Sequence, residues 1–240
     1  MKVFPYLIFR ECNSLSYGLL VAEKGSYNGA SRDVEFISVP GRDGDLIIDN
    51  GRHKNITIPY KLTLLNNTER DFKTLAHQIK AWLTGEPGYF TLWDSYDPEY
   101  FRYAAYIDEV DIEQELEAVG NITVNFNCKP FKYALQGQEP VILTAAATLY
   151  NAEAFPSKPY IKITGSGDIT LTINEEAFSF SGVEDYIEID SEIMDAYKGI
   201  TLLNNRMSGN GFPIFVPGEN NIAFTGAVTE IEIIPRWCRK

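Results

Sequence analysis

The chain has 240 residues, 45% of them hydrophobic, and its 33 acidic against 21 basic side chains give a formal net charge of −12. This hydrophobic content excludes a disordered chain and is enough for one large all-β domain or two ordinary domains. The acidic balance excludes a surface built to bind nucleic acid, because phosphate contacts need clustered basic side chains. The first twenty residues hold neither an unbroken apolar run nor a cleavage site, so we expect cytoplasmic synthesis without membrane insertion.

The cysteines and histidines are few and widely spaced. Cys12, Cys128 and Cys238 are odd in number and far apart, which predicts free thiols rather than a disulfide framework. The histidines are His53 and His77. A zinc or copper site needs several His or Cys ligands close together, so we expect no metal and no cofactor.

The stretch "VPGRDGDLIIDNGRHKNITIPYKLTLL", residues 39–65, joins a turn-rich segment to a strand. Pro40, Gly41 and Gly44 predict tight turns. Apolar residues at every second position from 56 to 64 predict a half-buried strand. The segment lacks the glycine order and the Lys-Ser/Thr of a phosphate loop. We therefore interpret it as a projecting ribbon, which a partner would stabilise.

The acidic residues of this ribbon could in principle bind a calcium ion. An EF-hand loop that begins at Asp43 would need a glycine sixth and a glutamate twelfth, where the chain has Ile48 and Lys54. A different calcium geometry, with Asp43, Asp45 and Asp49 as oxygen ligands, stays open.

One helix is predicted in "NTERDFKTLAHQIKAWLTGEPG". Thr68 can cap its first turn with Asp71 three residues on, and Gly85 ends it. We interpret His77 on this helix as a packing or surface residue. The apolar residues recur at helical spacing and comprise Phe72, Leu75, Ala76, Ile79, Trp82 and Leu83.

Aromatic and acidic residues concentrate in "TLWDSYDPEYFRYAAYIDEV". A glycosidase would need two carboxylates on either side of a sugar cleft. Acids as close in sequence as those of "YDPEY" more often decorate a turn, and tyrosine-rich surfaces are typical of protein contacts. Without a nucleophile and base pair elsewhere, we expect a protein interface here, no catalytic residues, and no enzyme.

From about Gln136 the chain consists of short alternating segments separated by turn signals such as "GSGD" and "VPGEN". This pattern predicts a β-sandwich, in which Ile169, Leu171 and Ile173 share one face. Strands also dominate the first half, as in "NITVNFNCKPF". We therefore predict a mainly β protein with two domains, residues 1–135 and 136–240.

Four stretches together resemble the distal tail protein (Dit) family of siphophages, the phages with long, non-contractile tails. They are "VPGRDGDLIIDNGRHKNITIPYKL", "NCKPFKY", "YIKITGSGDITLTIN" and "VPGENNIAFTGAVTEIEIIPRW". The resemblance implies an N-terminal belt domain with one helix and a long hairpin, which forms a hexameric ring, and a C-terminal galectin-like β-sandwich. The implied place is the distal tail tip of the virion.

The resemblance also implies partners. The ring would join the tail tube protein to the tail-associated lysin or spike and to receptor-binding proteins, without binding nucleic acid directly. For the contacts between copies in the ring we expect the hairpin residues Arg42, Asp43, Asp45, Ile47 and Arg52. Galectins bind galactosides with a set of residues that includes a histidine, and this sequence has none after His77.

The alternative function is carbohydrate binding, which would anchor the phage on the host cell wall. Aromatic side chains are the stacking platforms that sugars prefer. The candidates are Trp93, Tyr96, Tyr100 and Trp237.

Overall fold

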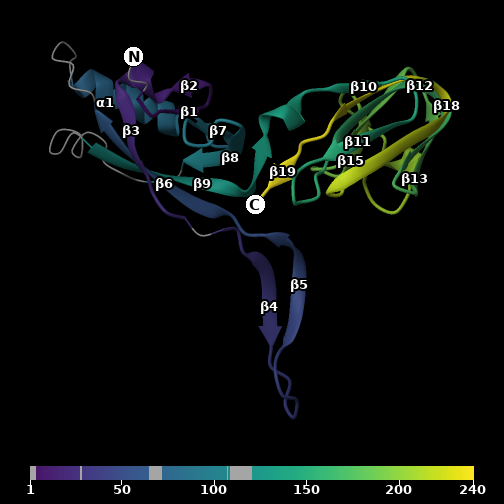
Figure 1. Cartoon of the computed structure of the whole chain (residues 1–240), viewed down its shortest axis with the longest axis horizontal. Coiled ribbons are helices and arrows are strands. Elements are labelled where there is room, and N and C mark those ends of the chain that lie inside the picture. Colours follow the sequence, from purple (N-terminus) through teal and green to yellow (C-terminus); the bar gives the residue numbers. More distant parts are fainter. Residues whose placement is uncertain (1–3, 28, 65–71, 107, 109–120) are drawn as a thin grey trace. The chain divides into compact units, whose positions relative to one another are not determined.

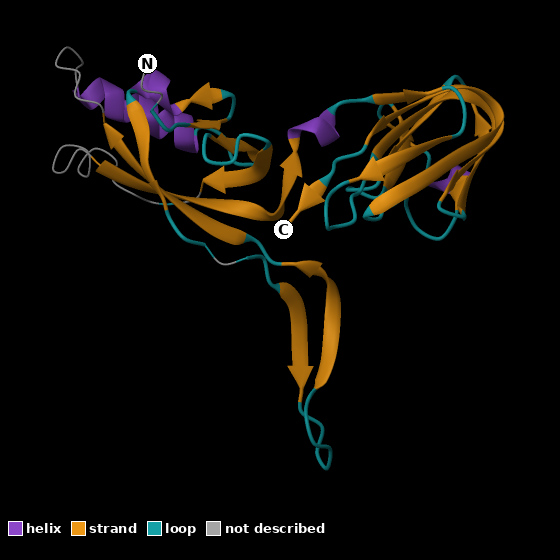
Figure 2. Cartoon of the chain, viewed as in Figure 1, coloured by secondary structure: helices purple, strands orange, loops and turns teal. Residues whose placement is uncertain are grey.

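The computed structural model describes residues 4–27, 29–64, 72–106, 108 and 121–240. Strands dominate it, which confirms the predicted mainly β fold (Figures 1 and 2). The chain divides into two compact units, Met1–Lys132 with Lys240 as the first and Tyr133–Arg239 as the second. The roles expected for the two domains, ring formation and a galectin-like sandwich, stay predictions.

The first unit is built on one curled antiparallel sheet. Its strands follow the order β2-β1-β7-β8-β9-β6-β3. The backbone N–H of Val21 donates to the carbonyl of Pro5 at 2.9 Å, which ties the edge strand to the residues before the first strand and bends the sheet round on itself. The strands are β1 (Leu7–Phe9), β2 (Cys12–Asn13), β3 (Leu19–Lys24), β6 (Ile56–Leu64), β7 (Phe90–Asp94), β8 (Tyr100–Tyr106) and β9 (Asn121–Ala134), and a 3-10 turn, η1 (Ser14–Tyr17), precedes β3.

The alternation predicted for residues 56–64 is confirmed in β6. Its apolar residues face the core opposite those of β9, where Ile58 pairs with Phe126 and Leu62 with Ile122. Because successive side chains of a strand point to opposite faces, this register buries one complete face of both strands.

Helix α1 (Phe72–Thr84) packs on this core and ends before Gly85, as predicted. The indole N–H of Trp82 donates to the carbonyl of Phe9 at 2.8 Å and so fixes the helix to β1. His77 is exposed. The expected cap, Thr68 with Asp71, and the side chain of residue 72 lie outside the described part. The other predicted apolar positions are buried: Leu75, Ala76, Ile79, Trp82 and Leu83.

Strands β4 (Arg32–Ile37) and β5 (Leu46–His53) form a separate two-stranded sheet, residues 32–53, which we call the arm (Figure 1). The ribbon predicted at 39–65 therefore splits. Its first part is the turn and second strand of the arm, whereas 56–64 belongs to the large sheet as β6. Strand β4, which precedes the predicted ribbon, completes the hairpin.

The second unit is a β-sandwich with one continuous hydrophobic core, in which Ile169, Leu171 and Ile173 are buried as predicted. Two short 3-10 turns, η2 (Leu135–Gln138) and η3 (Asn204–Arg206), lie in this unit, and the two-residue strand β19 (Cys238–Arg239) follows the sandwich. The sandwich strands are β10 (Val141–Leu143), β11 (Ala147–Asn151), β12 (Tyr160–Ile173), β13 (Glu176–Val183), β14 (Tyr186–Asp190), β15 (Asp195–Lys198), β16 (Thr201–Leu202), β17 (Met207–Ser208) and β18 (Gly218–Ile234).

The long strands β12 and β18 run through both layers of the sandwich (Figure 1). The first half of β12 pairs with β14 and its second half with β13, while β18 follows it on the other side along the whole length. The register shifts where both strands bend. At Gly226, φ is +104° and an added Cβ would lie 2.5 Å from the carbonyl oxygen of Asp168, so the two backbones meet where only glycine fits.

Candidate assembly interface

The arm exposes an unusual amount of apolar surface. Phe36 is 64% exposed and Ile47 is 59% exposed, although both are large hydrophobic residues of regular strands. The remaining exposed apolar residues of the arm and its turn are Ile37, Val39, Leu46 and Ile48. A two-stranded sheet alone is at best marginally stable in water, and clustered apolar exposure marks an interaction surface.

Both faces of the arm carry these residues. Phe36 lies opposite Ile47 on one face, and Ile37 lies opposite Leu46 on the other. A hairpin that only covered its own protein would need one apolar face. Two apolar faces fit insertion between surfaces of another protein or another copy.

Ion pairs stiffen the base of the arm. The carboxylate of Asp33 accepts from Arg52 Nε at 2.7 Å and lies 3.3 Å from Lys54 Nζ. Across the hairpin, Arg32 pairs with Asp49, whose other oxygen accepts from the backbone N–H of Gly51 at 2.9 Å. The hydrogen bond from Arg52 lowers the pKa of Asp33, and that from Gly51 lowers the pKa of Asp49, so both carboxylates stay charged.

The predicted interface residues all lie on the arm. Arg42, Asp43 and Asp45 are in the exposed turn between β4 and β5, and Ile47 and Arg52 are on β5. Their part in an interface stays a prediction. The open calcium alternative gains no support, because the part of the chain that the structure describes holds no group of three acidic, Cys or His side chains able to bind a metal ion.

The sugar-stacking candidates differ in exposure. Trp93 is half-buried, tilted against Tyr6, and donates its indole N–H to the carbonyl of Pro98 at 3.0 Å. Tyr100 is only 8% exposed, and the ammonium of Lys132 lies 4.9 Å from its ring centroid.

Tyr96 is the most open of the four at 48% exposure. Trp237 belongs to the second unit and packs against Phe215 with 5.5 Å between ring centroids.

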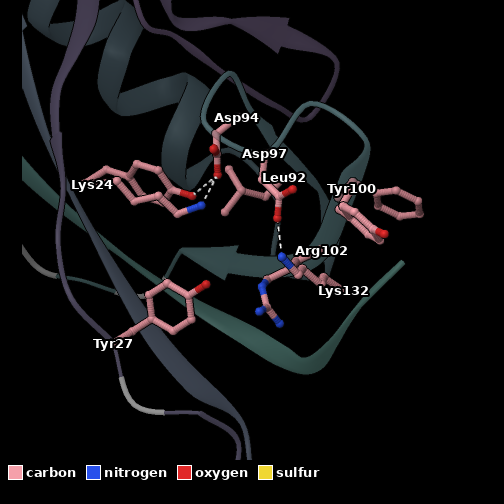
Figure 3. Close-up of a pocket in the computed structure, with 10 residues that line it drawn as sticks. Lys24, Tyr27, Leu92, Asp94, Asp97, Tyr100, Arg102 and Lys132 are labelled. Atoms are coloured by element: carbon pink, nitrogen blue, oxygen red, sulfur yellow. Dashed lines mark hydrogen bonds and ion pairs between the residues drawn. The ribbon is translucent and has the colours of Figure 1, made fainter. Parts of the chain in front are cut away.

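Asp94 and Asp97, two acids of the aromatic stretch, belong to a charged cluster inside the first unit (Figure 3). Asp94 accepts from the Lys24 ammonium at 2.7 Å and from the Tyr60 hydroxyl at 2.5 Å. Burial, and then the charge of Asp94, raise the pKa of Tyr60, which keeps the phenol protonated. Asp97 pairs with Lys132.

The cavity beside this cluster encloses about 20 Å³. Small-molecule sites usually enclose roughly 300–1,000 Å³, so a sugar ring does not fit here. Asp94 and Asp97 each have a lysine partner, Lys24 and Lys132. Only the three-dimensional curl of the sheet brings these lysines, from β3 and β9, to the turn that holds the aspartates.

Comparison with known proteins defines the class. Residues 16–128 match the model of the phage tail protein RIFT-related domain family, a stretch that runs from η1 into β9. Just under half of the chain is thus similar to a domain of phage tail proteins. A search of the curated proteins found no significant match. None of the helices in the described ranges is long and apolar enough to cross a membrane.

The fold is shared with a solved structure. The whole chain is similar in structure to the Dit protein (gp 19.1) of phage SPP1, with a TM-score of 0.71 and 15% sequence identity over 97% of this chain and 98% of that one. SPP1 Dit is described as a paradigm of the hub adsorption apparatus in phages that infect Gram-positive bacteria. The family match and the shared fold confirm the resemblance to the siphophage distal tail proteins that the four sequence stretches indicate.

Proposed function

We propose that this protein forms a closed ring, most simply a hexamer, that serves as the hub at the distal end of the tail. In the ring, the arm of each copy binds the next copy. The similarity to SPP1 Dit supports the hub role, and the apolar arm supports the assembly. A contact between two different surfaces of identical subunits closes into a ring when the rotation between them divides a full turn.

The single observation that carries this proposal is the arm. Its apolar residues are exposed on both faces, and ion pairs connect its two strands at the base. A preformed shape lowers the entropy cost of binding, so such a hairpin is prepared for a partner surface.

The division into two units suggests a division of tasks. In the proposal, the first unit, which holds the arm, forms the ring at the end of the tail tube and receives the lysin or spike protein. The second unit is free to bind peripheral proteins such as the receptor-binding protein. The virion tail tip is the location that follows from these tasks.

The first test is the mass of the purified protein in solution, by light scattering over a concentration series with negative-stain images. A ring of six 27.1 kDa chains has a mass of about 163 kDa and a central hole. The matched control removes the arm. Because Arg32 lies opposite His53, residues 33–52 can be replaced by Asn-Gly, a pair that closes a two-residue hairpin.

The expected result is a ring for the full chain and a folded monomer for the shortened chain. Rings of the shortened chain would contradict the role of the arm. A monomer of the full chain at every concentration, even with the tail tube and lysin proteins present, would contradict the hub.

A further inference from the structure

Arg102 of β8 is a largely buried residue whose guanidinium forms no ion pair in the described part of the chain. The residue is 7% exposed, and a guanidinium stays protonated in proteins. One of its nitrogens, Nη1, donates to the carbonyl of Pro130 at 3.3 Å, and the guanidinium carbon lies 5.6 Å from the centroid of the Tyr27 ring. Within the described ranges no carboxylate lies within 4.0 Å of it. Among the described residues, no Arg102 nitrogen is both sealed from solvent and without a hydrogen-bond partner, so its remaining N–H donors are open to solvent.

The other charges around the same cavity are already matched. Lys24 binds Asp94, and Lys132 binds Asp97, so each of these two ion pairs has no net charge. Arg102 adds one positive charge that the lining does not balance. Water can reach this guanidinium, and an anion beside it would add a charge-assisted hydrogen bond, which is stronger than a hydrogen bond between neutral groups.

We propose that this cavity binds one small anion, held by the guanidinium of Arg102. Figure 3 shows the guanidinium of Arg102 and the hydroxyl of Tyr27 directed toward the same space, below the two ion pairs in this view. A volume of about 20 Å³ admits a group the size of one water molecule, such as a halide ion or the end of a carboxylate. Arginine is well suited to this task because its N–H groups form a planar fork of donors.

Two kinds of anion could supply the negative charge that Arg102 binds. The anion is either a dissolved monoanion or the carboxylate of an acidic side chain from a second copy. The second source rests on the proposed ring, and the first does not. A dissolved ion would stabilise the unassembled chain, whereas an inserted side chain would strengthen the assembly.

The solution test uses the full chain in sodium chloride and in sodium methanesulfonate at constant ionic strength. The sulfonate group, with three oxygens and a methyl group on sulfur, is larger than a halide ion and does not fit a volume of about 20 Å³. A ligand that binds only the folded state stabilises it in proportion to the logarithm of its concentration above Kd. Tm of the wild type is therefore expected to rise as chloride replaces methanesulfonate. Arg102→Gln is expected to lose that rise. Lys158→Gln, which removes an exposed positive charge in the second unit, is expected to keep it.

Crystals of the wild-type chain in sodium bromide locate the ion without any variant, in case Arg102→Gln does not fold. We expect an anomalous peak within hydrogen-bond distance of Arg102, or a carboxylate of a second copy in its place. In that second case, chloride leaves Tm of the assembly unchanged, and Arg102→Gln raises the concentration at which the assembly dissociates.

Water alone in the cavity would overturn the proposal. A second outcome also overturns the proposal: a bromide peak in the crystal, together with an equal rise of Tm with chloride in the wild type and in Arg102→Gln. This outcome would mean an adventitious ion only. A third outcome separates the two proposals: the wild type is a monomer, and its Tm rises with chloride while that of Arg102→Gln does not. This result would support the anion site and contradict the ring.

Discussion

The apolar arm gives the most direct test of assembly, through the double substitution Phe36→Ser with Ile47→Ser. These side chains lie opposite each other on one face of the arm, 64% and 59% exposed. Fully burying a large apolar side chain contributes about 1.5–3 kcal/mol. Covering the exposed part of each therefore contributes about 1–2 kcal/mol to each contact between copies, or about 2–4 kcal/mol for both.

This loss corresponds to an association constant that is roughly 30-fold to 1,000-fold weaker. Because both side chains are already exposed in the single chain, the unfolding free energy of the monomer is expected to change by less than about 0.5 kcal/mol for each substitution. Weaker assembly with unchanged folding is the signature of an interface residue.

The assay is mass photometry over a dilution series, combined with thermal unfolding of the monomer. Ile200→Ser is the matched control, since Ile200 is 103% exposed but belongs to the second unit. The wild type and the control are expected to dissociate at the same concentration, and the double variant at a much higher one. Equal dissociation of all three proteins would refute the arm as the ring contact.

Two further predictions concern the second unit. Gly226→Ala is expected to lower the unfolding free energy of this unit by about 2 kcal/mol or more, because φ is positive there and the added Cβ approaches the Asp168 carbonyl. Gly211→Ala is the control, since Gly211 also has a positive φ but lies in open space. In urea unfolding, this control is expected to lower the unfolding free energy by less. Burial opposes ionisation of Asp190, but the two hydrogen bonds from Arg236 prevail and lower its pKa. The unfolding free energy should therefore decrease as pH falls below about 4, and a decrease just as steep in Asp190→Asn would exclude this pair as the cause.

Strand patterns with one buried face were predictable from the sequence. Residues 56–64 and 169–173 alternate apolar and polar positions because each strand has a core on one side and solvent on the other. The helix was predictable for the same reason, since its buried residues recur at helical spacing.

The arm and the charged cluster were only partly predictable. Strand β4, "RDVEFI", carries apolar residues on both of its faces, and no alternation distinguishes it from a loop. Turn chemistry at Gly41 and Gly44 located the hairpin, but its length depends on pairing with β4. The ion pair of Lys24 with Asp94 joins residues 70 positions apart, and nothing local in the sequence indicates such a contact.

The continuity of β12 and β18 has a consequence for the time course of synthesis. All of the first unit except Lys240 has been made at residue 132, but the sandwich cannot close until β18 ends at Ile234, about 100 residues later. β12 ends at Ile173, 61 residues before the end of β18. At roughly 5–20 residues per second, β12 therefore waits about 3–12 s for its longest partner. Nascent chains are thus expected to present a finished arm beside an open sandwich, so that copies made on one messenger can meet through their first units while their second units are still folding.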